Sequence, residues 1–169
     1  MAKVLIIYHS KSGNTEKMAK AVQEGAASAG ATVTLKDAIK ATADDMLNCD
    51  AVIMGTANYF SLLSGIVKDY FDRTFFTLKG KVDGKPYATF GSYGGGGTAA
   101  IESLNKLCDN LGLKQATDST LFMQNLSILW VDAENRSSAG SFYFWEISLE
   151  SMRRQQAKLP GLQWGQTIG

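Results

Sequence analysis

The chain has 169 residues, of which 45% are hydrophobic and 20% are charged, as in ordinary soluble globular proteins. This length predicts a single domain over residues 1–169 with a core of its own. The 17 Lys and Arg residues nearly balance the 16 Asp and Glu residues, so no strong overall field favours nucleic acid or an acidic membrane. With His9 as the one histidine, a His-rich metal site is excluded, and we expect no metal.

The sequence also bears on the cell compartment. No apolar run reaches the ~18 residues needed to span a bilayer, and the N-terminus lacks the apolar region of a secretory signal. Cys49 and Cys108 lie far apart and form no C-x-x-C pair, which is typical of reduced, largely buried thiols. We therefore expect a cytoplasmic protein.

The N-terminal half predicts alternating strands and helices. Val4–Tyr8 is β-branched and apolar on both faces, as in a buried strand. A helical pattern follows it, and Gly30 closes that helix. The next elements are a weaker, edge-like strand at Ala31–Lys36, a short helical turn from Asp44 and Asp45, a buried strand at Ala51–Gly55, and a helix from Gly65 whose apolar face includes Val67, Tyr70 and Phe71.

The C-terminal half continues the alternation. After a turn-rich loop, the expected elements are a strand at Tyr87–Phe90, a helix whose stripe is Ile101, Leu104, Leu107, Cys108 and Leu111, a strand at Gln115–Met123 that Ser127–Val131 extends or repeats, and a helix at about Ile147–Leu159. Alternation of this kind implies a parallel sheet covered on both faces. The sequence thus predicts an α/β fold with a doubly wound, five-stranded parallel sheet.

Three segments at the carboxyl ends of these strands differ from ordinary connections. They are H-S-K-S-G-N-T (residues 9–15), T-A-N-Y-F-S (residues 56–61) and G-S-Y-G-G-G-G (residues 91–97). Doubly wound sheets bind their ligands at this edge, where the strand order reverses. We therefore expect the three segments to form one ligand site.

The first segment joins a strand to a helix N-terminus, whose free N–H groups and positive dipole end suit a phosphate. Its candidate binding residues are Ser10, Lys11, Ser12, Gly13, Asn14 and Thr15. An ordinary N-cap is the alternative, in which Ser12, Asn14 or Thr15 caps the helix without a ligand. The segment matches neither G-x-x-x-x-G-K-[ST] nor G-x-G-x-x-G, which disfavours ATP and a Rossmann-type NAD as the resident ligand.

S-K-S-G-N-T after a buried strand resembles the phosphate loop of flavodoxins and their relatives, which bind FMN. Residues 52–75 resemble the flavin-flanking loop and following helix of that superfamily. Within residues 64–97, S-G-I-V-K-D-Y-F-D-R-T and G-K-P-Y-A-T-F-G-S-Y-G-G-G-G are more similar to NAD(P)H:quinone oxidoreductases of the tryptophan-repressor-binding-protein type. The match covers residues 3 to about 112, thins beyond that and is poor from about residue 125.

The resemblance implies a flavodoxin-like fold with strand order 2-1-3-4-5, non-covalent FMN, and no catalytic protein residue because the flavin carries the chemistry. It adds ten candidate cofactor-binding residues to those of the first segment: Thr56, Ala57, Asn58, Tyr59, Phe60, Ser92, Tyr93, Gly94, Gly95 and Gly96. Tyr59 either stacks on the isoalloxazine or packs against the protein. The glycine run suits close approach to a flat ring, with a flexible linker as the alternative.

One departure from classical flavodoxins bears on activity. They commonly cover the outer flavin face with a tyrosine late in the third segment, where this chain has Gly96 and Gly97, and they are strongly acidic, whereas this chain is near neutral. Both features favour an FMN-dependent oxidoreductase that uses NAD(P)H to reduce quinones or similar small acceptors. A one-electron carrier with a redox partner protein, and a non-redox interaction module, are the alternatives. Relatives of the quinone-reductase type are often oligomeric, so a homo-oligomer is a further expectation from the resemblance.

Two features stay open at this stage. His9 either contacts the phosphate or an entering substrate, or it is a structural histidine with a protein partner. The aromatic run Phe142–Trp145 either fills the core, lines the flavin pocket or forms a subunit interface.

Overall fold

The computed structural model describes residues 1–123. Three sequence predictions, the strand at Ser127–Val131, the aromatic run Phe142–Trp145 and the helix at Ile147–Leu159, lie outside the described residues. Within residues 1–123, no helix has the length and apolar character needed to cross a membrane.

A parallel sheet forms the centre of the fold, with the strand order β2-β1-β3-β4-β5 and with β6 also paired to β4. This order confirms the predicted doubly wound, flavodoxin-like architecture. The strands are β1 (Lys3–Tyr8), β2 (Thr32–Asp37), β3 (Ala51–Ala57), β4 (Pro86–Tyr93), β5 (Lys114–Gln115) and β6 (Thr120–Met123). The helices are α1 (Asn14–Ser28), α2 (Ala43–Leu47), α3 (Gly65–Leu78) and α4 (Ala99–Leu111).

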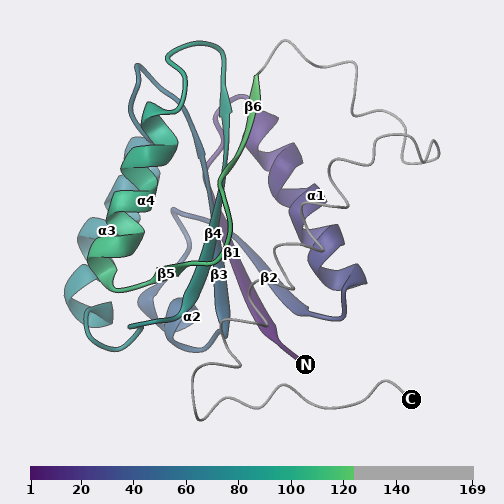
Figure 1. Cartoon of the computed structure of the whole chain (residues 1–169), viewed down its shortest axis with the longest axis vertical. Coiled ribbons are helices and arrows are strands. Elements are labelled where there is room, and N and C mark those ends of the chain that lie inside the picture. Colours follow the sequence, from purple (N-terminus) through teal and green to yellow (C-terminus); the bar gives the residue numbers. More distant parts are fainter. Residues whose placement is uncertain (124–169) are drawn as a thin grey trace.

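Helices cover both faces of the sheet. Figure 1 shows α1 on one side, and α3 and α4 on the other. The two faces follow from strand alternation, because successive side chains point to opposite sides. Along β1, Leu5 and Ile7 join the core under α3 and α4, whereas Val4 and Ile6 join the core under α1.

The end of α1 follows the predicted glycine signal. Gly30 has φ +85°, and its N–H donates to the Ala27 carbonyl while the Ala31 N–H donates to the Ala26 carbonyl. This pair of bonds is a Schellman motif, in which a left-handed residue satisfies the last carbonyls of a helix. The chain can then turn directly into the edge strand β2.

The short helix α2 begins with a capping box that sequence reasoning missed, although its Thr-x-x-Asp pattern was present. The Asp45 N–H donates to the Thr42 hydroxyl, and the Thr42 N–H donates to the Asp45 carboxylate. Lys36 of β2 completes the cluster with an ion pair of 2.6 Å to Asp45. Burial acts to raise the pKa of Asp45, but the hydrogen bonds from Lys36 and Thr42 outweigh it and hold that pKa below its ordinary value.

Three predicted element boundaries were wrong. The strands β3 and β4 run further than Gly55 and Phe90, because their parallel pairing continues to the pair Ala57 and Ser92. The predicted continuous strand Gln115–Met123 is interrupted, so that β5 pairs with the start of β4 and β6 with its end. Between them, the Ser119 hydroxyl bonds with Thr89 and accepts from Asn105, which draws the chain away from the ladder.

Both cysteines are free thiols, as predicted. Cys108 is a buried residue of α4, and Cys49 is half-buried. Burial raises the pKa of the Cys49 thiol to about 11, which leaves it protonated and weakly nucleophilic near neutral pH.

We predict that Asp45→Asn lowers the free energy of unfolding by about 0.5–1 kcal/mol at pH 7, because the charge-assisted part of the capping cluster is lost. The folded-state pKa is lowered, so the stabilisation is present above the unfolded value of about 3.9 and disappears as the pH falls through the lower folded value. Urea unfolding measures the free energy of unfolding of the variant and the wild type at pH 7 and at pH 3. Asp44→Asn is the control, because Asp44 is an acidic residue of the same first turn but takes no part in the capping box. A stability difference between Asp45→Asn and the wild type that is as large at pH 3 as at pH 7 would contradict the prediction.

Candidate functional site

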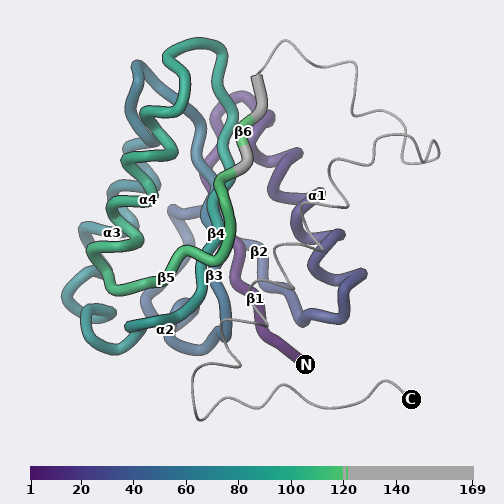
Figure 2. Tube along the Cα trace, viewed as in Figure 1, coloured from purple at the N-terminus to yellow at the C-terminus, as the bar shows by residue number. Residues whose placement is uncertain are grey.

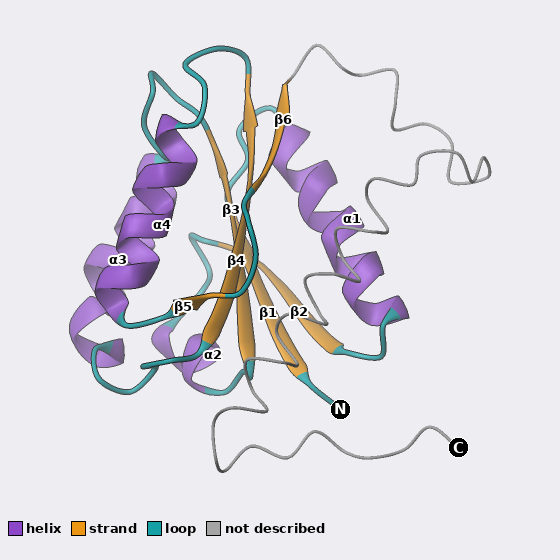
Figure 3. Cartoon of the chain, viewed as in Figure 1, coloured by secondary structure: helices purple, strands orange, loops and turns teal. Residues whose placement is uncertain are grey.

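Three loops meet at the carboxyl edge of the sheet, at the top of Figures 1 and 3. We call them the first loop (residues 9–13), the second loop (residues 58–64) and the glycine loop (residues 94–98). They follow β1, β3 and β4, which are neighbours in the sheet and run parallel. Parallel pairing therefore places together three segments that are far apart along the chain, as the colours of Figure 2 show.

Direct hydrogen bonds join the three segments. The hydroxyls of Thr15 and Ser92 are 2.9 Å apart and buried, which ties the start of α1 to the end of β4. The Lys11 N–H donates to the Tyr59 hydroxyl at 3.2 Å, which joins the first and second loops. The Asn58 N–H donates to the Ser92 carbonyl at 2.8 Å, which joins the second loop to the end of β4.

The N-terminus of α1 carries no side-chain cap. Its N-cap residue is Gly13, in the left-handed conformation with φ +86°, so the predicted alternative of a cap by Ser12, Asn14 or Thr15 is wrong. Thr15 instead turns inward to Ser92. The helices α3 and α4 also lack a side-chain cap, whereas α2 has a full capping box. The first N–H groups of α1 are therefore available to an anion.

Unpartnered polar atoms mark the same region. Among the described residues, two buried side-chain polar atoms have no hydrogen-bond partner, the Ser10 hydroxyl oxygen and Asn58 Oδ1. Buried polar groups in proteins are nearly always paired, because an unmade bond costs about 1–3 kcal/mol. Both atoms lie on the loops, which is the pattern expected where a ligand supplies the missing partners.

The second loop contains a strained two-residue turn. Phe60 and Ser61 both have positive φ, 55° and 64°, and mutual backbone bonds of 2.9 and 3.0 Å between Tyr59 and Leu62 close the turn. Left-handed backbone costs a residue with a side chain about 1–2 kcal/mol. The turn presents Phe60, which is 99% exposed, and Leu62, which is 62% exposed.

The glycine loop packs against the second loop at one point. Gly94 to Gly97 are exposed, and Gly96 has φ +79°. A Cβ at Gly96 would lie 2.8 Å from the Ser61 hydroxyl oxygen and 3.1 Å from Asn58 Nδ2. Glycine is therefore required here both by the backbone conformation and by the close approach of the two loops.

The structure gathers the predicted site residues at this edge, but they fall into two groups. Thr15 at the start of α1 is buried, as are Thr56, Ala57 and Ser92 at the ends of β3 and β4. The Thr56 hydroxyl accepts from the Ser64 N–H at 2.9 Å. Their main contribution is to hold the loops. The exposed or half-buried predicted residues are Ser10, Lys11, Ser12, Gly13, Asn14, Asn58, Tyr59, Phe60, Tyr93, Gly94, Gly95 and Gly96.

Sequence reasoning missed two contacts at this edge. Ser61 contacts the Gly96 position, and the Gly97 carbonyl accepts from Asn58. Both residues lie in the predicted segments, but no local pattern shows that loops 35 residues apart touch.

Three basic side chains of the first loop and α3 have acidic partners within the protein, whereas Lys11 is exposed. His9 Nδ1 lies 3.3 Å from Asp37 Oδ2, which agrees with the structural alternative for this histidine. On α3, Arg73 lies 2.8 Å from Asp69, and Lys68 is paired with Asp72. Lys11 is exposed beside the N-terminus of α1, where a cation favours an anionic ligand.

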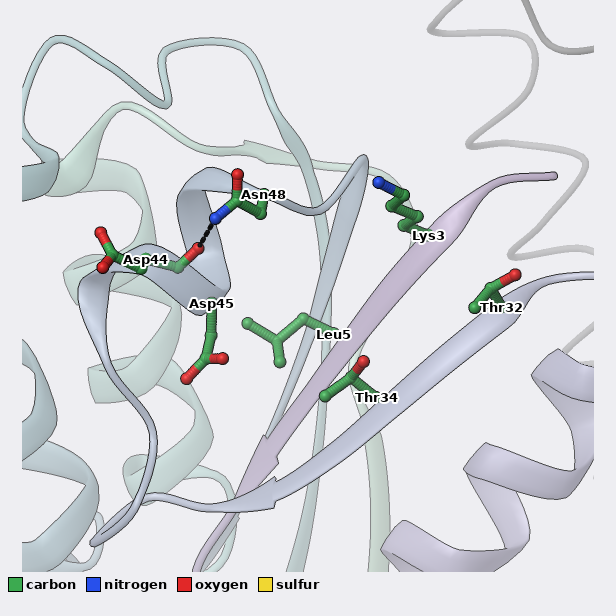
Figure 4. A pocket seen from close by; sticks show the side chains of 7 residues that line it. All are labelled: Lys3, Leu5, Thr32, Thr34, Asp44, Asp45 and Asn48. Carbon is green, nitrogen blue, oxygen red and sulfur yellow. Dashed lines mark hydrogen bonds between the residues drawn. The ribbon is translucent and has the colours of Figure 1, made fainter.

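A separate hollow lies away from the three loops, along the amino-terminal halves of β1 and β2 beside α2 (Figure 4). Its lining includes Asp45, whose carboxylate is held by Lys36 and Thr42. These contacts stabilise the capping box, and the hollow holds no unpartnered buried side-chain atom. Its described lining residues therefore do not point to a ligand.

Comparison with known proteins agrees with this geometry. The family model for flavodoxin matches residues 6–138, which is most of the chain. The chain belongs to the flavodoxin family. Among curated relatives, a flavodoxin of Aquifex aeolicus is 39% identical over 116 residues, covering 66% of this chain and 63% of the relative.

A second relative is named as an enzyme. An NAD(P)H dehydrogenase (quinone) of Rhodopseudomonas palustris is 35% identical over 132 residues, covering 63% of this chain and 66% of the relative. This flavodoxin-family chain thus spans a little under two thirds of the length of these relatives. Among solved structures, a flavodoxin from the domain Archaea superposes with a TM-score of 0.69 at 19% identity, covering 91% of this chain and 99% of that one, which shows the shared fold.

We predict that Gly96→Ala destabilises the protein by about 1–2 kcal/mol, because the new methyl group needs both a left-handed backbone and space that Ser61 and Asn58 fill. Urea unfolding measures the change. Gly95→Ala is the matched control in the same loop, because a Cβ at Gly95 meets no atom within 4 Å and its φ is not left-handed. Equal effects of the two substitutions would show that the contact between the loops is unimportant.

Proposed function

We propose that the three loops bind FMN non-covalently and that the protein is an FMN-dependent oxidoreductase, which takes electrons from NAD(P)H and reduces a quinone or a similar small acceptor. The observation that carries the cofactor proposal is the position of Ser10 Oγ and Asn58 Oδ1, the two unpartnered buried polar atoms of the described chain, on these loops. Membership of the flavodoxin family supports the same cofactor.

The donor set fits a phosphate at one end of the site. The uncapped N-terminus of α1 offers backbone N–H groups, Ser10 offers a hydroxyl without a partner, and Lys11 offers a nearby positive charge. Gly13 has open space at its Cβ position, so the backbone is accessible there. We assign the phosphate contacts to residues 10–15.

The other two loops suit a flat ring. We assign ring contacts to Asn58, Tyr59 and Phe60 of the second loop and to residues 92–96, with Thr56 and Ala57 beneath them. Half-buried Tyr59 is fixed by its bond from Lys11, and the exposed glycines leave backbone N–H groups accessible to ring oxygens. When bound, FMN would supply the redox chemistry, while the protein supplies position, electrostatics and exclusion of water.

The choice of an enzyme rests on the openness of the site and on charge. Residues 94–98 are exposed and carry no large side chain over the site, and the net charge of +1 gives no overall acidic field to attract a basic redox protein. His9 is held by Asp37 and is not needed as an acid or base. Several relatives of this family member are named NAD(P)H dehydrogenase (quinone).

A one-electron carrier is the second candidate, and one observation favours it. Phe60 and Leu62 form an exposed apolar tip beside the site, which suits a transient contact with a protein. The Aquifex aeolicus relative is named a flavodoxin. For either activity we propose a cytoplasmic location, and self-association is a proposal drawn from oligomeric relatives.

We predict that Ser10→Ala weakens FMN binding about 10- to 100-fold and leaves riboflavin binding unchanged, because a hydroxyl bond to a charged phosphate contributes about 1.5–3 kcal/mol. Flavin fluorescence quenching on titration of apoprotein measures both affinities. Ser28→Ala is the control, since the Ser28 hydroxyl donates to Gly25 near the other end of α1. Equal loss of FMN and riboflavin affinity would place Ser10 away from the phosphate.

We predict that NADPH or NADH bleaches the oxidised flavin absorbance of the FMN-loaded protein under anaerobic conditions, and that a quinone restores it. Stopped-flow absorbance follows both steps. If neither nucleotide bleaches a flavin that dithionite reduces, the oxidoreductase proposal fails and the carrier is favoured.

A further inference from the structure

Asn58 occupies an unusual position, because its side chain lies between the two loops that we assign to the ring. Its backbone N–H already joins β3 to β4 through the Ser92 carbonyl. Its side-chain Nδ2 donates to the Gly97 carbonyl at 3.2 Å, across 39 residues of sequence. Apart from the packing at Gly96, this is the one side-chain hydrogen bond among the described residues that holds the glycine loop to the second loop.

The orientation of the carboxamide follows from this bond. The Gly97 carbonyl can only accept, so the end of the Asn58 side chain that faces it must be the nitrogen. Oδ1 then points away from Gly97, where it is buried and has no partner. An amide oxygen accepts only, so whatever satisfies Oδ1 must be a hydrogen-bond donor.

The packing at Gly96 keeps the carboxamide in place. An added Cβ at Gly96 would lie 3.1 Å from Nδ2 and 3.5 Å from Oδ1 of Asn58. The glycine loop therefore covers the carboxamide closely on that side. Rotation of the side chain would break the bond to Gly97 and push against this loop.

We propose that Asn58 is a bifunctional positioning residue: Nδ2 latches the glycine loop to the second loop, and Oδ1 accepts a hydrogen bond from an N–H or O–H group of the bound flavin. The second part rests on the proposed FMN binding, whereas the first part is independent of any ligand. A flavin that satisfies Oδ1 would remove the cost of an unpaired buried acceptor and would hold the carboxamide in the latched orientation. Cofactor binding and closure of the glycine loop are thereby coupled.

Two substitutions separate the two roles. Asn58→Ala removes the donor and the acceptor, whereas Asn58→Asp keeps an oxygen at the Oδ1 position and replaces the donor by an oxygen that faces the Gly97 carbonyl. Asn48→Ala is the matched control, because Asn48 Nδ2 also donates to a backbone carbonyl, that of Asp44 at 2.8 Å, but at the end of α2. Circular dichroism checks that each full-length variant is folded.

The first measurement is the backbone ¹⁵N NMR order parameters of residues 94–98 in the apoprotein. Loss of the bond that holds the loop predicts lower order parameters in both Asn58 variants, moving toward the flexible range below about 0.6, and unchanged values in Asn48→Ala. Unchanged order parameters in the Asn58 variants would overturn the latch.

The second measurement is FMN affinity by fluorescence quenching, together with the visible spectrum of the bound flavin. Asn58→Ala should bind FMN about tenfold more weakly than Asn58→Asp and shift the flavin absorbance band, while Asn48→Ala matches the wild type. Affinities of the two Asn58 variants within twofold of each other would overturn the acceptor role. Absence of FMN binding by the wild type would instead refute the proposed function, and the order parameters of residues 94–98 would still decide the latch.

Discussion

The parallel pairing of β1, β3 and β4 is the constraint on which the candidate site depends. Because these strands run in the same direction, their carboxyl ends lie along one edge, and the loops that follow them meet there. The pairing continues to Ala57 and Ser92, and both residues are buried. The bond between Thr15 and Ser92 then fixes the start of α1 relative to β4.

Around this buried base, the loops adopt conformations that cost stability. The second loop holds Phe60 and Ser61 in the left-handed region, and the first loop leaves α1 without a side-chain cap. Elsewhere the chain uses favourable devices, such as the capping box of α2 and the glycine at the end of α1. Strain and unpaired polar atoms confined to one edge are the pattern of a binding site, where the ligand completes what the fold leaves open.

The same edge contains residues that differ in burial. Thr56 and Ser92 are buried and bonded within the fold, whereas residues 94–98 are exposed and have few contacts. A flat cofactor needs both kinds of residue: buried ones that fix its position in the site, and an exposed loop that lets it enter. Asn58 joins the two parts, because its backbone N–H donates to the Ser92 carbonyl of β4 and its side chain donates to the Gly97 carbonyl of the glycine loop.

The sequence by itself determined the fold class, most of the elements and the location of the candidate site. Those features depend on local chemistry: apolar runs define buried strands, helical spacing defines α3 and α4, and the resemblance of residues 10–15 to a phosphate loop indicates the cofactor. Only the tertiary structure decided the ends of β3 and β4, the break between β5 and β6, and the inward turn of Thr15. Each of these is set by a partner distant in the chain, and the contact between Asn58 and Gly97 exists only because the sheet brings two loops together.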